Sequence, residues 1–135
     1  MDNYIAQVLD GSLIAGEKIK LACQRHLDDL EKAKKPDYPY YYDDAQAKKA
    51  IQFMELLPGT DGKPIKMLGF QKFIISSLYG WRTKEGNYRR FNRAFISMSR
   101  KNSKTYLASS MAANALVMEQ EPSQGKQALF VSNAL

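Results

Sequence analysis

The residues whose types and spacing suggest chemistry lie at positions 98–105, which read Met-Ser-Arg-Lys-Asn-Ser-Lys-Thr. Before them, apolar and polar side chains alternate at every second residue, at Phe91, Arg93, Phe95 and Ser97, which we interpret as a strand. After them comes a helical pattern rich in Ala, Leu and Met. A strand, a basic loop and a helix that opens with Lys-Thr form the layout of a phosphate-binding loop.

In such a loop, backbone N–H groups at the helix start face the anion, a lysine reaches the terminal phosphates and a hydroxyl ligates Mg²⁺. Lys104 and Thr105 supply the lysine and the hydroxyl. The usual glycines are missing, because Met98 and Ser103 stand at their positions. A side chain at position 103 hinders close approach of the backbone to phosphates, so we expect weaker nucleotide binding than a glycine would give. By spacing alone, a basic turn without a phosphate role remains an open alternative.

Composition and charge favour an anionic partner and a reducing compartment. The 135-residue chain has 20 Lys and Arg against 14 Asp and Glu, a net charge of +6. Between Arg82 and Lys104 there is only one acidic residue, Glu85. A nucleotide, nucleic acid or membrane surface fits this charge, as does a basic surface without a partner. Single Cys and His residues exclude an internal disulfide and a Cys/His zinc cluster. With no signal peptide and no apolar run long enough to span a bilayer, we expect a cytoplasmic protein.

Periodicity predicts a helix-rich α/β chain. Apolar residues recur at helical spacing in five stretches, and two shorter stretches have strand character. The predicted helices cover residues 3–10, 12–35 (capped by Ser12), 43–57 (capped by Asp43), 67–81 and 104–120, and the predicted strands cover 89–98 and 127–132. The strands and the helix between them form a β-α-β unit. Cys23 and His26 fall on or beside an apolar stripe, which predicts packing roles for both.

Residues 35–42 form a linker with two prolines and four tyrosines. Exposed tyrosines stack on bases in proteins that bind single strands. The alternative, which we favour, is that the rings cover the neighbouring helices.

Ser99-Arg100-Lys101-Asn102-Ser103-Lys104-Thr105 resembles the deviant Walker A loop of tailed-phage terminase large subunits, which commonly reads Pro or Ser, Arg, Lys, Asn, Gly, Lys, Ser or Thr. The resemblance continues in the family's order through residues 4–5, 16–30, 42–58, 68–75 and 78–81. It implies N-terminal helices at 1–66, followed at 67–135 by the first strand, P-loop, helix and strand of a RecA-like P-loop NTPase sheet that is incomplete here.

The resemblance also implies residue roles in binding ATP and Mg²⁺. Lys104 resembles the lysine on the β- and γ-phosphates, and Arg100 resembles the arginine that senses the γ-phosphate, which makes these two the catalytic candidates. Thr105 resembles the Mg²⁺ ligand. Gln71 is similar to the glutamine that reads adenine, with Phe70 beside the base. The remaining nucleotide-binding candidates are the loop residues Lys101, Asn102 and Ser103.

The family is an ATPase motor that packages double-stranded DNA into procapsids. Its implied partners are DNA, a terminase small subunit, a portal protein and copies of itself, in the cytoplasm of a bacterial host. After Thr105 the only acidic residues are Glu119 and Glu121, so the acidic Walker B strand is missing. We therefore expect an N-terminal fragment that hydrolyses ATP negligibly.

Two alternatives to a packaging motor remain open. One is another P-loop motor, such as a helicase, whose distinguishing motifs would lie beyond residue 135. The other is a non-enzymatic basic module that binds DNA or protein, in which arginines contact phosphates directly. The arginines concerned are Arg82, Arg89, Arg90 and Arg93.

Overall fold

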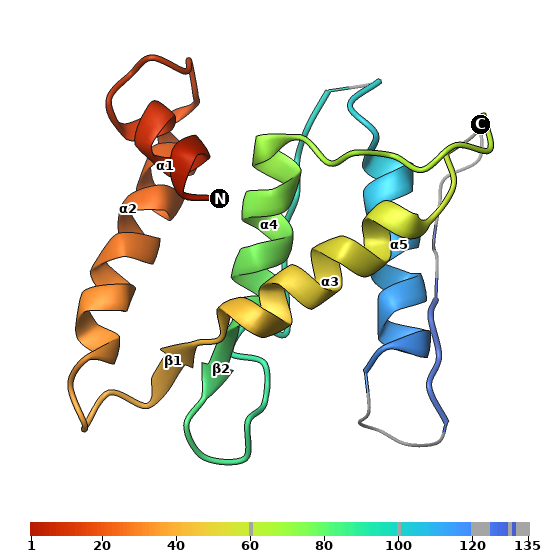
Figure 1. Ribbon diagram of the computed structural model, residues 1–135. Helices are drawn as coiled ribbons and strands as arrows, with labels where there is room; N and C mark the ends of the chain where they lie inside the picture. Colours follow the sequence, from red (N-terminus) through yellow and green to blue (C-terminus); the bar gives the residue numbers. More distant parts are fainter. Residues whose placement is uncertain (60, 100, 120–124, 130, 132–135) are drawn as a thin grey trace. The chain divides into compact units, whose positions relative to one another are not determined.

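The computed structural model describes residues 1–59, 61–99, 101–119, 125–129 and 131 (Figure 1). Its elements are α1 (Asp2–Leu9), α2 (Glu17–Ala33), β1 (Tyr40–Tyr42), α3 (Asp44–Leu56), α4 (Gly69–Gly80), β2 (Trp81–Thr83) and α5 (Lys104–Val117). The chain divides into two compact units. Residues 1–51 and 66–96 form the first unit, and residues 52–65 and 97–135 form the second.

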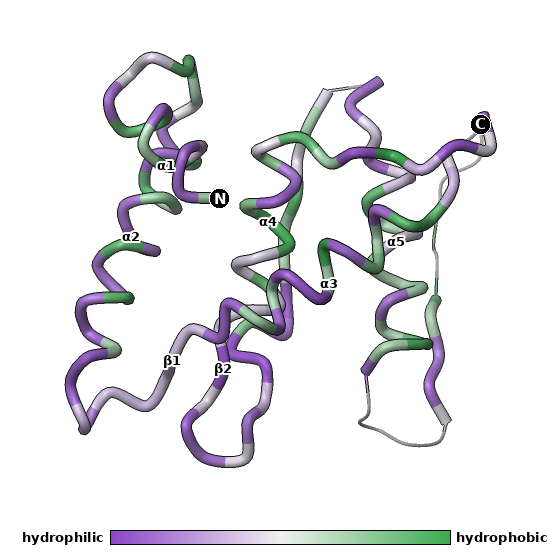
Figure 2. The backbone as a smooth tube through the Cα atoms, in the orientation of Figure 1, coloured by the Kyte–Doolittle hydropathy of each residue, from purple (hydrophilic) through white to green (hydrophobic). Residues whose placement is uncertain are grey.

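The core of the first unit joins α1, α2 and α4. Ile5 and Val8 of α1 are buried with Cys23 of α2 and Phe73 of α4. Figure 2 shows hydrophobic and hydrophilic residues interspersed along these helices, as expected when one face of each helix is covered. Cys23 is fully buried, which confirms its predicted packing role.

The tyrosine-rich linker ends in a short strand. β1 pairs antiparallel with β2, with Tyr40 opposite Thr83 and Tyr42 opposite Trp81. The Tyr42 ring packs edge-on against Trp81, with 5.4 Å between centroids, and the Tyr38 hydroxyl donates to Asp29 over 2.8 Å. These contacts confirm the predicted packing role for Tyr38 and Tyr42.

One predicted helix cap is confirmed and the other is wrong. The Gln46 N–H donates to Asp43 Oδ1 over 3.0 Å, so Asp43 caps α3 as predicted. Ser12 does not cap α2, which begins at Glu17. Both the N–H and the hydroxyl of Ser12 donate to Asp10 Oδ1, over 2.8 and 2.6 Å. The Asp10 carboxylate therefore holds Ser12 in a turn, a local bond that competes with helix formation.

The predicted β-α-β unit is not confirmed. Its helix forms as α5, but residues 91–99 form no strand, nor do 125–129 and 131, so the predictions for 89–98 and 127–132 are wrong where the structure describes them. A strand needs a partner for its backbone N–H and C=O groups, and neither segment pairs with another described segment beyond the Arg82–Arg89 bridge. Phe95 and Leu129 are 95% and 88% exposed, so no layer covers them. The sheet found is the antiparallel β1–β2 pair, and the RecA-like arrangement is not confirmed.

Candidate nucleotide site

The loop before α5 enters the helix through a left-handed backbone. Lys101 and Ser103 have φ angles of 66° and 57°, a region that favours glycine. Ser103 is the N-cap residue, yet its side chain makes no capping hydrogen bond. Positions 101–105 are exposed. The start of this 14-residue helix is thus uncapped by a side chain and open to solvent, which suits an anion.

Hydrogen bonds within the loop hold it in a folded-back form. The Asn102 amide donates to the Ser99 hydroxyl over 2.6 Å, and the Lys104 ammonium donates to the Met98 carbonyl over 3.0 Å. Both Lys104 and Thr105 lie in the first turn of α5. The structure therefore brings together Lys101, Asn102, Ser103, Lys104 and Thr105, whereas Arg100 lies outside the described residues.

The body of α5 is fixed within its own unit. The Tyr106 hydroxyl donates to the Met54 carbonyl over 2.7 Å. Leu107, Ser110 and Asn114 are buried at helical spacing on one face of α5. The exposed helix start is therefore presented by a helix whose next turns are anchored.

The start of α4 has the opposite character. Gln71 is only 2% exposed, and its Oε1 accepts the Leu68 N–H over 2.9 Å. This bond satisfies one backbone N–H group at the helix start, as the third residue of a capping box does. The side-chain oxygen of Gln71 therefore caps α4, and the neighbouring Phe70 is half-buried.

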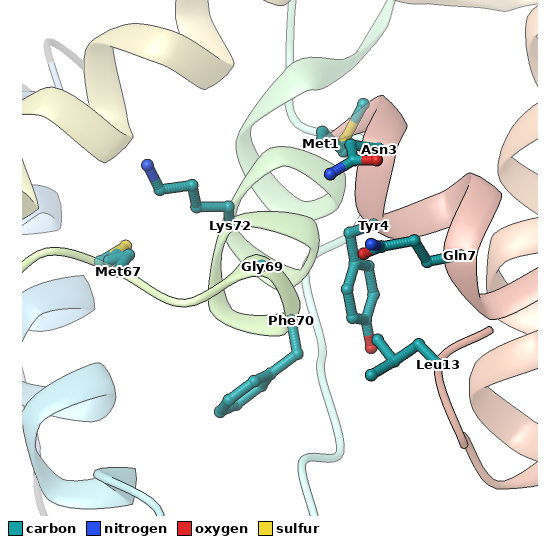
Figure 3. Close-up of a pocket in the computed structure, with 9 residues that line it drawn as sticks. All are labelled: Met1, Asn3, Tyr4, Gln7, Leu13, Met67, Gly69, Phe70 and Lys72. Atoms are coloured by element: carbon teal, nitrogen blue, oxygen red, sulfur yellow. The ribbon is translucent and has the colours of Figure 1, made fainter.

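A cavity of about 510 Å³ lies between α1 and α4 in the first unit. Its lining, drawn in Figure 3, includes Asn3, Tyr4 and Gln7 of α1 and Gly69, Phe70 and Lys72 of α4. Met1, Leu13 and Met67 complete its lining. Gly69 has a packing reason, because a Cβ there would lie 3.0 Å from the Tyr4 ring. Phe70 is thus at the cavity, whereas Gln71 is not among the lining residues.

Comparison with protein families gave one match in this part of the chain. The model described as "Terminase large subunit, ATPase domain" matches residues 69–133. This stretch is terminase ATPase-domain sequence. Comparisons with curated proteins and with solved structures gave no match. The match begins at the first residue of α4 and includes both the Phe70-Gln71 pair and the loop before α5, so it confirms the resemblance over this stretch. For residues 1–68 the resemblance stays a prediction, and so does the domain boundary between residues 66 and 67.

Most arginines of the terminase segment that were candidates for DNA contact are engaged in the fold. Arg82 donates to the Tyr79 and Asn87 carbonyls over 3.3 and 3.0 Å. The Arg89 guanidinium lies 5.4 Å from the centroid of the Tyr79 ring. Arg89 and Arg93 are both exposed, so these two remain the accessible members of the set.

Arg90 is the centre of a buried cluster that the sequence did not predict. Its guanidinium donates to Asp29 over 2.7 Å and lies 4.5 Å from the centroid of Tyr40 and 5.3 Å from that of Trp81. Burial alone would raise the pKa of the Asp29 carboxyl, but hydrogen bonds from Tyr38 and Arg90 and the Arg90 charge hold that pKa below its ordinary value. The available signal was Asp29, which lies three residues after His26 on the buried side of α2.

His26 packs within the same aromatic region, as predicted. Trp81 Nε1 donates to His26 Nδ1 over 3.1 Å, and the two rings meet edge-on at 5.6 Å. Burial lowers the pKa of the His26 imidazole. An imidazole that accepts at Nδ1 is neutral, so its proton is on Nε2. His26 therefore has a structural role as a neutral acceptor.

Among the described residues, no helix is long and apolar enough to cross a membrane. Within the same residues, no three His, Cys, Asp or Glu side chains gather as a metal site.

Proposed function

We propose that this chain carries the phosphate-binding part of the ATPase of a terminase large subunit, the motor that packages double-stranded DNA. The observation that supports this is the uncapped, exposed start of α5, with Lys104 and Thr105 in its first turn, inside the segment that matches the terminase ATPase family. In the whole motor, the partners would be DNA, the terminase small subunit, the portal protein and further copies of the large subunit.

The chain's own residues account for the binding of Mg·ATP. The Lys104 ammonium exchanges the Met98 carbonyl for β- and γ-phosphate oxygens, which are charged and therefore stronger acceptors. Backbone N–H groups of Ser103, Lys104 and Thr105 face the phosphates, and the Thr105 hydroxyl ligates Mg²⁺. Lys101, Asn102 and Arg100 complete the loop, with Arg100 at the γ-phosphate. Mg²⁺ would neutralise charge that develops on the phosphates.

Titration of the chain with Mg·ATP, followed by backbone amide chemical shifts in NMR spectra, tests this proposal. We expect the amides of residues 101–105 to shift, and Lys104→Ala to weaken binding by more than about tenfold through loss of a charge-assisted contact. Lys18→Ala, on the exposed start of α2, is the matched control and should bind as the parent does. Equal affinity of the parent and the Lys104→Ala variant would overturn the proposal.

We further propose that this chain by itself turns ATP over very slowly. The only acids after Thr105 are Glu119 and Glu121, and Glu119 follows helix α5 and not a strand that would place a carboxylate at Mg²⁺. Phosphate release from Mg·ATP measures this directly. Robust turnover that Lys104→Ala abolishes would overturn this expectation while supporting the binding proposal.

A further inference from the structure

An apolar side chain is fully exposed in the turn that joins α1 to α2. Ile14 is 99% exposed, whereas its neighbour Leu13 is 39% exposed and lines the cavity between α1 and α4. Single exposed apolar residues are ordinary on protein surfaces, but an exposed residue beside an apolar cavity is typical of a contact with another molecule. Ile14 and the cavity therefore form one surface feature, which lies within the first unit.

Hydrogen bonds hold the turn that carries Ile14 in one form. The Leu13 N–H donates to the Gln7 carbonyl over 2.8 Å, which ties the turn back to α1. The Ser12 hydroxyl donates to Asp10 Oδ1 over 2.6 Å. Because the turn is already ordered, little backbone freedom is lost when a partner covers Ile14.

The cavity beside this turn offers an aliphatic side chain a preformed apolar surface. Tyr4 and Phe70 provide its aromatic walls (Figure 3). The Tyr4 ring is fixed by packing, since its centroid lies 5.7 Å from that of Phe73 and a Cβ at Gly69 would lie 3.0 Å from it. A side chain that enters the cavity therefore exchanges water for apolar contacts. The remaining apolar lining residues are Met1, Leu13 and Met67.

The charges around the turn and around the cavity have opposite signs. Residues 1–17 carry three acidic and no basic side chains, and Asp10 and Glu17 flank Ile14. Lys72 is the one charged residue among the nine that line the cavity in the described part of the chain. Opposite charges around an apolar contact favour the matching partner over others. The cavity thus suits an aliphatic side chain with acidic neighbours, which this chain itself carries at Ile14.

A two-fold pair of chains uses such a feature twice, because the projecting residue and the cavity lie side by side. We propose that a second copy of this chain docks on this face, with Ile14 of each copy in the α1–α4 cavity of the other. This inference rests on the proposed function only in naming further copies as partners, to which it assigns a surface. Phe70, which the resemblance places beside the adenine base, contacts the partner chain in this arrangement.

Sedimentation velocity of the full chain tests this inference. One aliphatic side chain in each cavity gives a small interface, so we expect a dimer with a dissociation constant of about 10–100 μM. Ile14→Asp should raise this constant more than about tenfold. Because Ile14 is exposed, the unfolding of this variant should match that of the parent. Leu21→Asp, at a 56% exposed position of α2, is the matched control and should dimerise as the parent does.

Backbone amide chemical shifts, followed by NMR as the concentration of the chain rises, locate the contact. We expect the amides of residues 13–14 and 69–70 to shift and those of residues 101–105 to stay constant. A chain that stays monomeric overturns the inference and leaves this face to a protein of another kind. A dimer that Ile14→Asp leaves intact, or whose shifts lie elsewhere, such as at exposed Phe95, overturns it as well.

The proposed function is tested separately, because its phosphate loop belongs to the second unit. Tripolyphosphate should shift the amides of residues 101–105 equally in the parent and in Ile14→Asp. If the dimer forms as expected and tripolyphosphate shifts nothing in either protein, the proposed function fails and this inference stands. If tripolyphosphate binds and the chain stays monomeric, this inference alone fails.

Discussion

The two helix starts that were expected to contact ATP are built in opposite ways. α4 begins from an extended Leu68, and the buried Gln71 side chain caps it. α5 begins from a left-handed Ser103 whose side chain caps nothing, and its first residues are exposed. Unsatisfied N–H groups are a cost to stability and a receptor for an anion at the same time. The start of α4 is therefore satisfied by a side chain of the fold itself, whereas the start of α5 leaves backbone N–H groups that the proposed nucleotide would satisfy.

The largest loss of stability is expected when the side-chain cap of α4 is removed. Gln71→Ala removes the acceptor for the Leu68 N–H and empties a buried volume, so we expect the free energy of unfolding to fall by about 2 kcal/mol. Ser103→Ala is the counterpart at α5 and should change it by less than about 0.5 kcal/mol, because no cap is lost. Urea unfolding of both variants measures the difference. Equal losses would show that the two helix starts are satisfied alike.

Acid should act on the far end of α4, where Trp81 follows the helix and donates to neutral His26. The pKa of His26 is lower in the folded chain than in the unfolded chain, so the unfolded state takes up the proton first. His26 therefore contributes stability above its unfolded pKa of about 6.5, and this is lost as the pH falls toward the folded pKa.

Unfolding measured between about pH 7.5 and pH 5.5 tests the role of His26, because unperturbed carboxyl groups titrate below that window. We expect the free energy of unfolding to decrease through it. In His26→Gln, whose amide oxygen can accept from Trp81, the same window should be flat. A slope that survives in His26→Gln would assign the pH dependence to another group.

The sequence predicted elements that depend on local pattern better than elements that depend on partners. α5 begins at Lys104 as expected, because a helix satisfies its own backbone and needs only a periodic pattern. The strand expected at 89–98 depended on pairing with another segment, which no local pattern specifies, and it did not form. Ser12 has the residue type of a helix cap, but the Asp10 carboxylate two residues earlier accepts its N–H and hydroxyl and keeps it in a turn.

The same division holds for the candidate site. Lys104 and Thr105 were identifiable, because a lysine and a hydroxyl at a helix start define that chemistry by their adjacency. The cavity was not identifiable, since it joins α1 to α4 across some sixty positions of sequence. Arg90 illustrates the limit most clearly. Its place in a basic stretch suggested phosphate contact, whereas in the fold its guanidinium forms an ion pair with buried Asp29.

A smaller change in stability, of opposite sign, is expected when the left-handed backbone at the start of α5 is relieved of strain. Ser103→Gly removes a left-handed Ser, which is strained by about 1–2 kcal/mol, and glycine's greater freedom in the unfolded chain offsets about half of this gain. We expect a stabilisation of up to about 1 kcal/mol together with tighter binding of tripolyphosphate. Ser109→Gly makes the same chemical change within helical backbone and should destabilise by about 1 kcal/mol. Tighter or equal tripolyphosphate binding by the parent would show that Ser103 does not hinder the phosphates.

The smallest effect on stability is expected at the residue with the largest expected effect on ATP. Lys104 is exposed, and its bond to the Met98 carbonyl exchanges readily with water, so Lys104→Ala should change the free energy of unfolding by less than about 0.5 kcal/mol. Gln71→Ala, at the start of α4, should instead destabilise the chain. Chemical unfolding gives the stability of each variant, and a tripolyphosphate titration of the same samples gives its affinity for phosphate. If Lys104→Ala destabilised the chain as much as Gln71→Ala does, the bond from Lys104 to the Met98 carbonyl would be a structural contact of the loop, and Lys104 could not exchange it for phosphate at little cost to stability.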